Sequence, residues 1–194
     1  KAAGPPAIHA RSPSTVDVVF RSRGVGSHII AHVATTWIAD SACPVPPCVG
    51  STTTVRSEVN SNRPSRLALV SAGANQMLLV QATNGITSTG NLWAQTFTSA
   101  AGWSASVSLG THHSGQNVGL AYMPSDGSVR LYALGKDDKL WQGIMYSLGS
   151  WGPWSLVWPD AQPAGKSNEW FVGGPAVALD RSGVFLTVAD RWIT

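Results

Sequence analysis

Tryptophan and planar polar side chains recur close together along this chain, a combination that suits the binding of sugars. The chain carries 9 Trp among 194 residues. An aromatic ring packs against the apolar face of a pyranose, and amide, carboxylate or guanidinium groups fix its hydroxyls. Each of these Trp residues could instead pack in the protein interior, which is the commoner role for Trp. The candidate binding residues are Trp93, Trp103, Trp141, Trp151, Trp154, Arg21, Asn91, Arg130, Asp137, Asp138 and Gln142.

Catalytic chemistry has little support in the residue pattern. The 10 acidic residues are spread thinly, whereas glycoside hydrolysis needs two carboxylates at a set separation. Asp126, Asp137, Asp138 and Asp180 fall in expected turns, where Asp is ordinary. The sequence contains no nucleophile elbow, phosphate-binding loop or zinc-protease motif. We therefore assign no catalytic residue, and we leave enzymatic activity open, with binding as the preferred interpretation.

The histidine spacing does not indicate a metal site. His28 and His32 are separated by four positions, which on a strand places them ~13 Å apart, too far to share one ion. His112 and His113 are adjacent and are expected in an exposed loop between two repeats. We expect no metal ion and no other cofactor.

Cys43 and Cys48 are the only cysteines, and they flank a short Pro-rich segment. One interpretation is a pair of free thiols. The other, which we favour, is a local disulfide of the kind found in oxidising compartments. It indicates a secreted, extracellular protein, although so short a loop would add little to global stability.

Low charge is the most informative feature of the composition. The formal net charge is +3, and only 12% of residues are charged. The basic residues form no cluster of the kind that nucleic acid requires, and no window approaches the ~20 consecutive apolar residues of a membrane-spanning helix. Residues 67–125 include no charged side chain at all. Such a surface suits a secreted protein that binds neutral ligands, and equally a secreted β-protein that binds none.

The chain repeats one unit, in which two apolar strands joined by a polar turn lead into further strands rich in Trp. Helical periodicity is missing and alternating β-branched patterns are frequent, which predicts an all-β fold. The clearest strands are residues 16–20, 77–80, 129–134 and 184–188, with outer strands of the first unit near 28–35 and 52–59. Turns are expected at Ser125-Asp126-Gly127 and at Asn84-Gly85.

Repeats of roughly 40–50 residues with four short strands are typical of β-propeller blades. The predicted blades cover about residues 6–60, 66–110 and 116–160, followed by an unfinished blade at 174–194 that holds only its two inner strands. About three and a half blades do not close a ring, and open strand edges invite pairing. We therefore expect a second chain or a second copy to complete the propeller. A separate partner chain is preferred, because two copies would have to build one blade from two pairs of inner strands.

Residues 14–24, 134–142, 151–157 and 174–180 resemble blade motifs of the seven-bladed lectin family named for the Photorhabdus lectin, and tectonin-type propellers are similar in style. The resemblance covers most of the chain, although the segment 83–90 and the Cys43–Cys48 insertion depart from the family pattern. It implies a propeller fold and carbohydrate binding at shallow sites between blades or on the loop face.

Taken together, the residues and the resemblance favour a secreted, lectin-like β-propeller that binds glycans. A second hypothesis is a non-catalytic portion of a processed extracellular enzyme, whose active site would lie with a partner chain. A third is an interaction module without a small ligand. Nucleic-acid binding and a membrane span are not expected.

Overall fold

The computed structural model describes residues 6–12, 15–23, 27–36, 48–50, 52–59, 65–73, 76–83, 90–113, 118–135, 137, 139–147, 149–158, 169–171, 175–179, 185–188 and 191–193. Within them the chain is all-β, with several antiparallel sheets and no helix, so the all-β part of the predicted fold class is confirmed. Across these same residues there is accordingly no helix long and apolar enough to cross a membrane.

Sheet A is the first of three five-stranded antiparallel sheets. It is a meander in which β1 pairs with β2 and β2 pairs with β3, while β4 and β5 both pair with β3. The outermost position is therefore shared by two strands in line. The strands of sheet A are β1 (Ala7–Ala10), β2 (Thr15–Arg23), β3 (Ser27–Thr36), β4 (Cys48–Val49) and β5 (Thr53–Val59).

Sheets B and C follow the same plan, each with a divided outermost strand. Sheet B consists of β6 (Ser65–Ser71), β7 (Gln76–Thr83), β8 (Gly90–Thr98), β9 (Gly102–Trp103) and β10 (Val107–His113). Sheet C consists of β11 (Gly119–Met123), β12 (Ser128–Leu134), β13 (Leu140–Ser147), β14 (Ser150–Trp151) and β15 (Ser155–Trp158).

The break in the outermost strand is the same in all three sheets. The amides of Gly50, Ser104 and Gly152 donate to the carbonyls of Ala34, Thr96 and Ile144, each at 2.8 Å. These hydrogen bonds and the strand registers align the sheets residue by residue. Asp17, Leu78 and Arg130 then occupy one equivalent position, since each lies opposite one of those three carbonyl residues.

The end of the chain forms two short pairs. β17 (Ala176–Leu179) pairs with β18 (Phe185–Val188), as expected for two inner strands of a fourth unit. β16 (Glu169–Phe171) pairs instead with β19 (Arg191–Ile193). The prediction that residues 174–194 hold only two strands is therefore wrong, because β19 is a further strand in this segment and pairs with β16.

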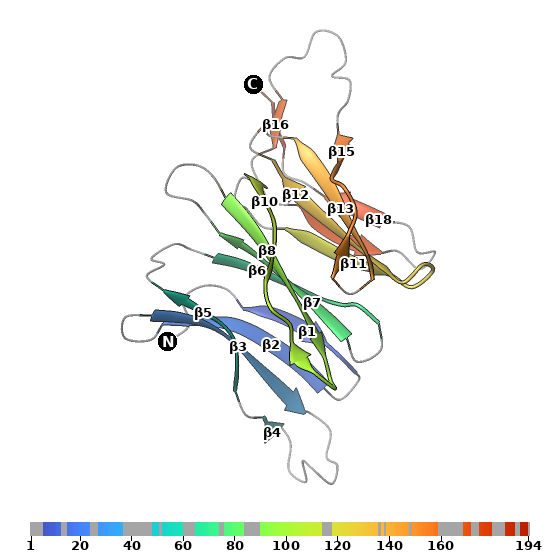
Figure 1. Cartoon of the computed structure of the whole chain (residues 1–194). Coiled ribbons are helices and arrows are strands. Elements are labelled where there is room, and N and C mark those ends of the chain that lie inside the picture. Colours follow the sequence, from blue (N-terminus) through green and yellow to red (C-terminus); the bar gives the residue numbers. More distant parts are fainter. Residues whose placement is uncertain are drawn as a thin grey trace.

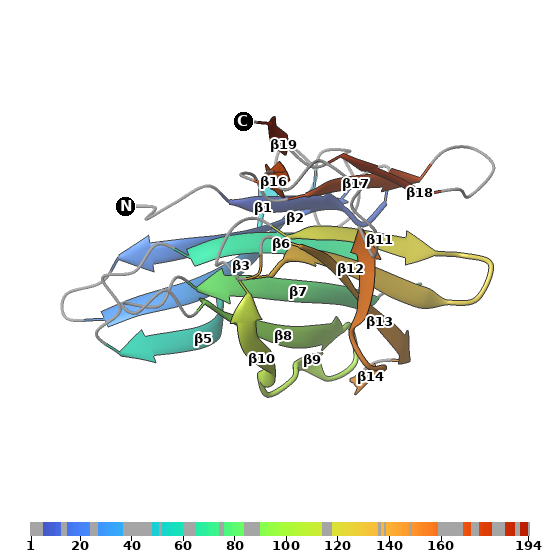
Figure 2. The same cartoon turned by 90° about the horizontal axis from the view of Figure 1, so that it is seen from above.

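The first strands of successive sheets lie side by side: β1 against β6, β6 against β11, and β11 against β17. Figure 1 shows the sheets stacked in chain order, with sheet A at the bottom and sheet C at the upper right. In Figure 2 the strands β1, β6, β11 and β17 gather on one side of the stack, and β5, β10 and β14 lie on the other. Sheet B is thus enclosed between sheets A and C.

Each sheet has two faces, which we call forward (toward the next sheet in chain order) and rear (toward the preceding sheet). Alternation along β7 places Leu78 and Val80 on the forward face of sheet B and Leu79 on its rear face. Leu78 and Val80 pack with Val129 and Leu131 of sheet C. Leu79 packs with Val19 and Ile30 of sheet A. All of these side chains are almost fully buried.

Several local predictions can be compared with the strands. Residues 16–20, 77–80 and 129–134 lie in β2, β7 and β12, as predicted. The predicted turn at Ser125-Asp126-Gly127 is confirmed, with Gly127 at φ 69°. His112 and His113 end strand β10, so the prediction that they lie in a loop is wrong. The Asn84-Gly85 turn lies outside the described residues. Closure into a propeller stays a prediction.

Candidate functional site

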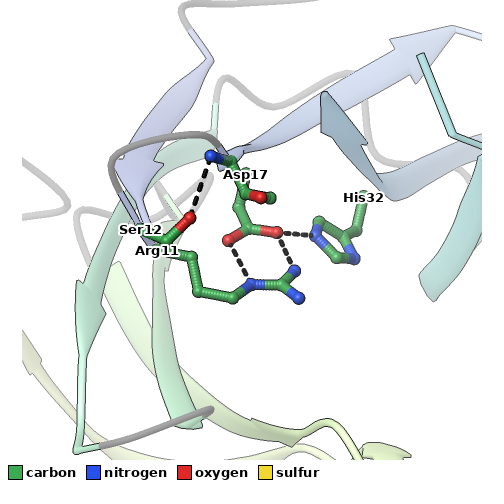
Figure 3. Close-up of polar contacts among 5 residues, drawn as sticks. Arg11, Ser12, Asp17 and His32 are labelled. Atoms are coloured by element: carbon green, nitrogen blue, oxygen red, sulfur yellow. Dashed lines mark hydrogen bonds and ion pairs between the residues drawn. The ribbon is translucent and has the colours of Figure 1, made fainter. Parts of the chain in front are cut away.

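Arg11, Asp17 and His32 form a buried ionic cluster on the forward face of sheet A (Figure 3). Asp17 on β2 and His32 on β3 lie on one face, since His32 is opposite Val19, two positions along the strand from Asp17. Arg11 comes from the β1–β2 turn, which is closed by a hydrogen bond from the Arg11 amide to the Thr15 carbonyl at 2.9 Å. The strand pairing and this turn therefore deliver the three side chains to one point.

The carboxylate of Asp17 is the centre of the cluster. Arg11 donates to it with two nitrogens, one of them Nε at 2.8 Å from Oδ2, and His32 Nε2 lies 2.8 Å from Oδ1. Because an ionised carboxylate only accepts, Nε2 carries the proton in this contact. Burial by itself would raise the pKa of Asp17, but the hydrogen bonds from His32 and Arg11, with the charge of Arg11, hold that pKa below its usual value. Asp17 is therefore a buried, fully paired anion.

Aromatic rings of sheet B close the cluster from the other side. The imidazole of His32 meets the rings of Phe97 and Trp103 edge-on, at centroid distances of 5.4 and 5.6 Å. The guanidinium of Arg11 lies over Phe97, 5.6 Å from the ring centre. Asp17 is 0% exposed and His32 6%, so no substrate reaches them. The cluster acts as a polar contact between sheets A and B.

The predicted platforms Trp103, Trp151 and Trp154 lie at contacts between sheets. Trp103 and Trp151 occupy equivalent positions on β9 and β14, and each packs against the core shared with the preceding sheet. Trp154 packs against the core between sheets B and C, and its Nε1 donates to the Leu109 carbonyl at 3.2 Å. All three remain partly exposed, and their role as sugar platforms stays a prediction.

Trp93 and Trp141 also occupy equivalent positions, on β8 and β13, and both are half-buried. Trp141 Nε1 donates to the Asp137 carboxylate at 3.1 Å, so these two predicted residues do lie together. Gln142 is directed to its own sheet, where its Nε2 donates to the Tyr132 hydroxyl at 3.0 Å. Asn91 is half-buried near the start of β8.

Of the two predicted arginines, one is buried and the other is hydrogen-bonded within the protein. Arg21 on β2 is 4% exposed. Arg130 on β12 donates to Asp126 Oδ2 at 3.1 Å. The predicted binding residues are thus distributed over all three sheets, and the structure does not bring them together at one site. Asp138 lies outside the described residues.

The cysteine prediction is only partly covered. Cys48 begins β4 and is half-buried. Cys43 lies outside the described residues, so the disulfide stays a prediction. Among the residues that the structure describes, no three His, Cys, Asp or Glu side chains gather in a way that could hold a metal ion.

A surface cleft of about 310 Å³ lies between sheets B and C, at the end of the stack where their hairpins turn. Tyr146 supplies an aromatic ring that is 59% exposed. A Cβ at Gly152 would lie 2.8 Å from this ring, so glycine there lets the ring approach the link between β14 and β15. The cleft is lined by Ala72, Gln76, Gly127, Met145, Tyr146 and Ser147.

The lining of this cleft is neutral. Gln76 is placed by the β6–β7 turn, where the Ala72 amide donates to its carbonyl at 2.9 Å and Gly73 takes φ 112°. The nearby Asp126 carboxylate is occupied, because it accepts hydrogen bonds from the amide and hydroxyl of Ser128 at 2.9 and 2.6 Å. These bonds hold the pKa of Asp126 below its usual value. The described residues that line the cleft therefore include an aromatic, an amide and a hydroxyl residue, and none of them is charged.

The sequence did not indicate the cleft. Tyr146 stands outside the Leu-Trp and Trp-Ser patterns that marked the candidate residues, and Gln76 and Ser147 are ordinary at strand ends. A large aromatic residue beside a turn was the one available signal. No protein-family model matches this chain, and no curated protein matches it.

Proposed function

We propose that the chain binds carbohydrate in the cleft between sheets B and C. The observation that carries this proposal is that Tyr146, which is 59% exposed, lines one cleft together with Gln76 and Ser147, and that none of the described lining residues is charged. A pyranose presents apolar C–H groups to an aromatic face and hydroxyls to amide and hydroxyl partners. A neutral lining favours a neutral sugar over a phosphorylated or acidic one.

The size of the cleft limits the ligand. Small-molecule sites span ~300–1,000 Å³, so a cleft of about 310 Å³ holds only one or two sugar rings. Affinity at a single cleft of this kind is expected to be weak. Useful binding would then depend on several sites acting together, because linked weak contacts raise the overall avidity.

We further propose that sheets A, B and C are blades of a β-propeller that is completed by another chain or another copy. The repeated four-position meander with its first strands side by side supports this proposal. The same proposal includes secretion and a Cys43–Cys48 disulfide. Thiol labelling of the unfolded, unreduced chain should find no free thiol, and two labelled thiols would contradict the disulfide.

A glycan array with the purified chain tests the sugar site. The parent should bind one or more neutral glycans. Tyr146→Ala should weaken that binding at least about fivefold, since the ring contact is worth roughly 1 kcal/mol or more. Tyr146→Phe keeps the ring and should stay within about threefold of the parent.

The matched control is Val107→Ala, which removes an exposed apolar side chain on β10 that does not line the cleft. Its glycan binding should equal that of the parent. Failure of the parent to bind any glycan, or equal binding by Tyr146→Ala, would remove the proposal.

A further inference from the structure

The inner strands of successive sheets interlock through a large and a small side chain. At the last such contact, Val177 of β17 lies against Gly119 of β11, where a Cβ would collide with the Val177 side chain. Gly119 is buried and Val177 half-buried. A branched side chain on one inner strand therefore fills the space left by a small residue on the preceding one.

The same two positions recur along the stack. The registers place Ile8, Leu69 and Leu120 at one equivalent position of β1, β6 and β11, opposite Val18, Leu79 and Leu131. Neighbouring positions hold the small residues, opposite Val19, Val80 and Tyr132. These small residues are Ala7, Ala68 and Gly119. Leu69 and Leu120 each pack against the core shared with the preceding sheet.

Both ends of the stack leave this contact unmatched among the described residues. At the start, Ile8 points from the rear face of sheet A and is 63% exposed. At the end, Ala176 and Ala178 of β17 are exposed, on the side away from Val177. One end thus presents an aliphatic side chain without a small partner, and the other presents small residues without an aliphatic partner.

Other side chains on the rear face of sheet A are also more exposed than their equivalents in sheet B. Val16 and Val18 are half-buried, whereas their equivalents are almost fully buried beneath a preceding sheet, at 1% for Met77 and Leu79. Among the elements that the structure describes, sheet A has another sheet packed only on its forward side (Figure 1). We expect the apolar rear face of sheet A to be covered by other β-strands, as the rear faces of sheets B and C are covered by the preceding sheets.

We propose that the rear face of sheet A binds the β17–β18 hairpin of a second copy of this chain, head to tail. Ile8 of one copy then lies over Ala176 and Ala178 of the other, as Val177 lies over Gly119 within one copy. The inference deepens the proposed propeller assembly by naming its partner, and it is independent of sugar binding. The contact is heterologous, and the proposal is that it closes a ring of two copies with two equivalent contacts rather than an open polymer.

Sedimentation equilibrium of the full chain over a wide concentration range tests the proposal. We expect a species of twice the 20.3 kDa chain mass. Ile8→Lys should raise the dissociation constant roughly 100-fold or more, because each contact would bury an unpaired ammonium. Val107→Lys is the matched control, since Val107 is 47% exposed on β10 in sheet B, and it should leave the dimer intact.

A mixing experiment tests the head-to-tail orientation. Ala178→Asp alone should also dissociate the dimer, from the opposite side of the contact. Mixing Ile8→Lys with Ala178→Asp creates one native contact and one Lys–Asp contact, and should restore dimers of mixed composition. Circular dichroism confirms that each variant is folded before its mass is measured.

Three results would overturn the inference. These are a folded parent that stays monomeric at all concentrations, growth into polymers of indefinite length, and folded variants that do not recover dimers on mixing. Glycan binding by Ile8→Lys separates this inference from the proposed function, because the cleft between sheets B and C lies within one chain. A dimer that binds no sugar would contradict only the proposed sugar site. A monomer that binds sugar would contradict only the proposed dimer.

Discussion

The two contacts between complete sheets use the same backbone plan, and both contain apolar side chains, but only the contact between sheets A and B also contains a buried ionic cluster. Between sheets B and C, the side chains that meet are aliphatic, with Leu78 and Val80 packed on Val129 and Leu131. Between sheets A and B, the equivalent of Leu78 is the buried anion Asp17, and the equivalent of Ala94 is His32. Stacking of the sheets therefore does not require one particular set of contacts.

One backbone carbonyl accepts a hydrogen bond from the next sheet in both contacts, although the donor differs. The carbonyl of Val55 in sheet A accepts from Gln95 of sheet B at 3.2 Å. The equivalent carbonyl, Leu109 in sheet B, accepts from Trp154 of sheet C at the same distance. Sheet C has Gly143 at the position of Gln95, and a Cβ there would lie 3.3 Å from the Trp154 ring. The acceptor is kept, while its donor comes from β8 in one contact and from the link between β14 and β15 in the other.

A buried ionic contact of this kind contributes more to the choice of packing partner than to the free energy of folding. A paired buried ion group gains little over an apolar pair of similar volume, but removal of one partner is costly because the remaining charges stay buried. We infer that the ionic cluster defines which sheet packs on sheet A. The aliphatic contact between sheets B and C would accept many apolar partners.

The largest expected effect is that of Asp17→Ala. This change leaves Arg11 and His32 without their shared acceptor in a buried site, and should lower the free energy of unfolding by about 3–5 kcal/mol. Chemical denaturation followed by Trp fluorescence measures the loss. Asp137→Ala, which removes an exposed carboxylate, should leave the denaturation midpoint near that of the parent. A loss below about 1 kcal/mol for Asp17→Ala would mean that the cluster is not a fixed contact.

Leu131→Ala probes the apolar contact. The side chain is 0% exposed, so its truncation leaves a cavity and should cost about 3 kcal/mol. The cost should be the same at pH 7 and pH 5, because no ionisable group takes part. A cost that changed markedly with pH would remove the distinction between the two contacts.

Acidification should weaken the contact between sheets A and B first. Burial lowers the pKa of His9, with the opposing effect of the Asp17 carboxylate outweighed, and the pKa of Asp17 is also lowered. A group with a lower pKa in the folded chain binds protons more tightly when unfolded, so stability falls as the pH drops. The loss should begin below the ordinary His value of about 6.5 and steepen below about 4.

Thermal melting between pH 7 and pH 3 measures this dependence. His9→Gln should flatten the upper part of the curve and Asp17→Asn the lower part, whereas Leu131→Ala should shift the curve without changing its shape. An identical shape for all variants would mean that other groups cause the acid sensitivity.

The smallest expected effects are those of the two cross-sheet donors. Gln95→Ala removes hydrogen bonds to the carbonyls of Val55 and Ser104, and Trp154→Phe removes the bond to Leu109. At about 1 kcal/mol for each hydrogen bond, Gln95→Ala should lower the free energy of unfolding by about 2 kcal/mol and Trp154→Phe by about 1 kcal/mol. Losses in this proportion would support the equivalence of the two acceptors. A loss confined to one variant would show that the repeat is equivalent in backbone only.

Local patterns in the sequence determined the all-β class, the strands around residues 16–20, 77–80 and 129–134, and the turn before Ser128. Each depends on neighbours a few positions apart, through alternation and through residues that tolerate positive φ. The repeated unit was visible for the same reason, since each sheet is a local meander of consecutive strands.

Only the tertiary structure decided where the side chains act. Arg11, Asp17 and His32 come together because β2 and β3 pair in one register, and a shift of one residue would move Asp17 to the other face. The cleft beside Tyr146 is lined by residues of two separate sheets, so it exists only once these sheets are packed together. The predicted Trp residues lie at scattered positions in the structure, since sequence spacing does not reveal which sheet face a residue shares with a neighbouring sheet.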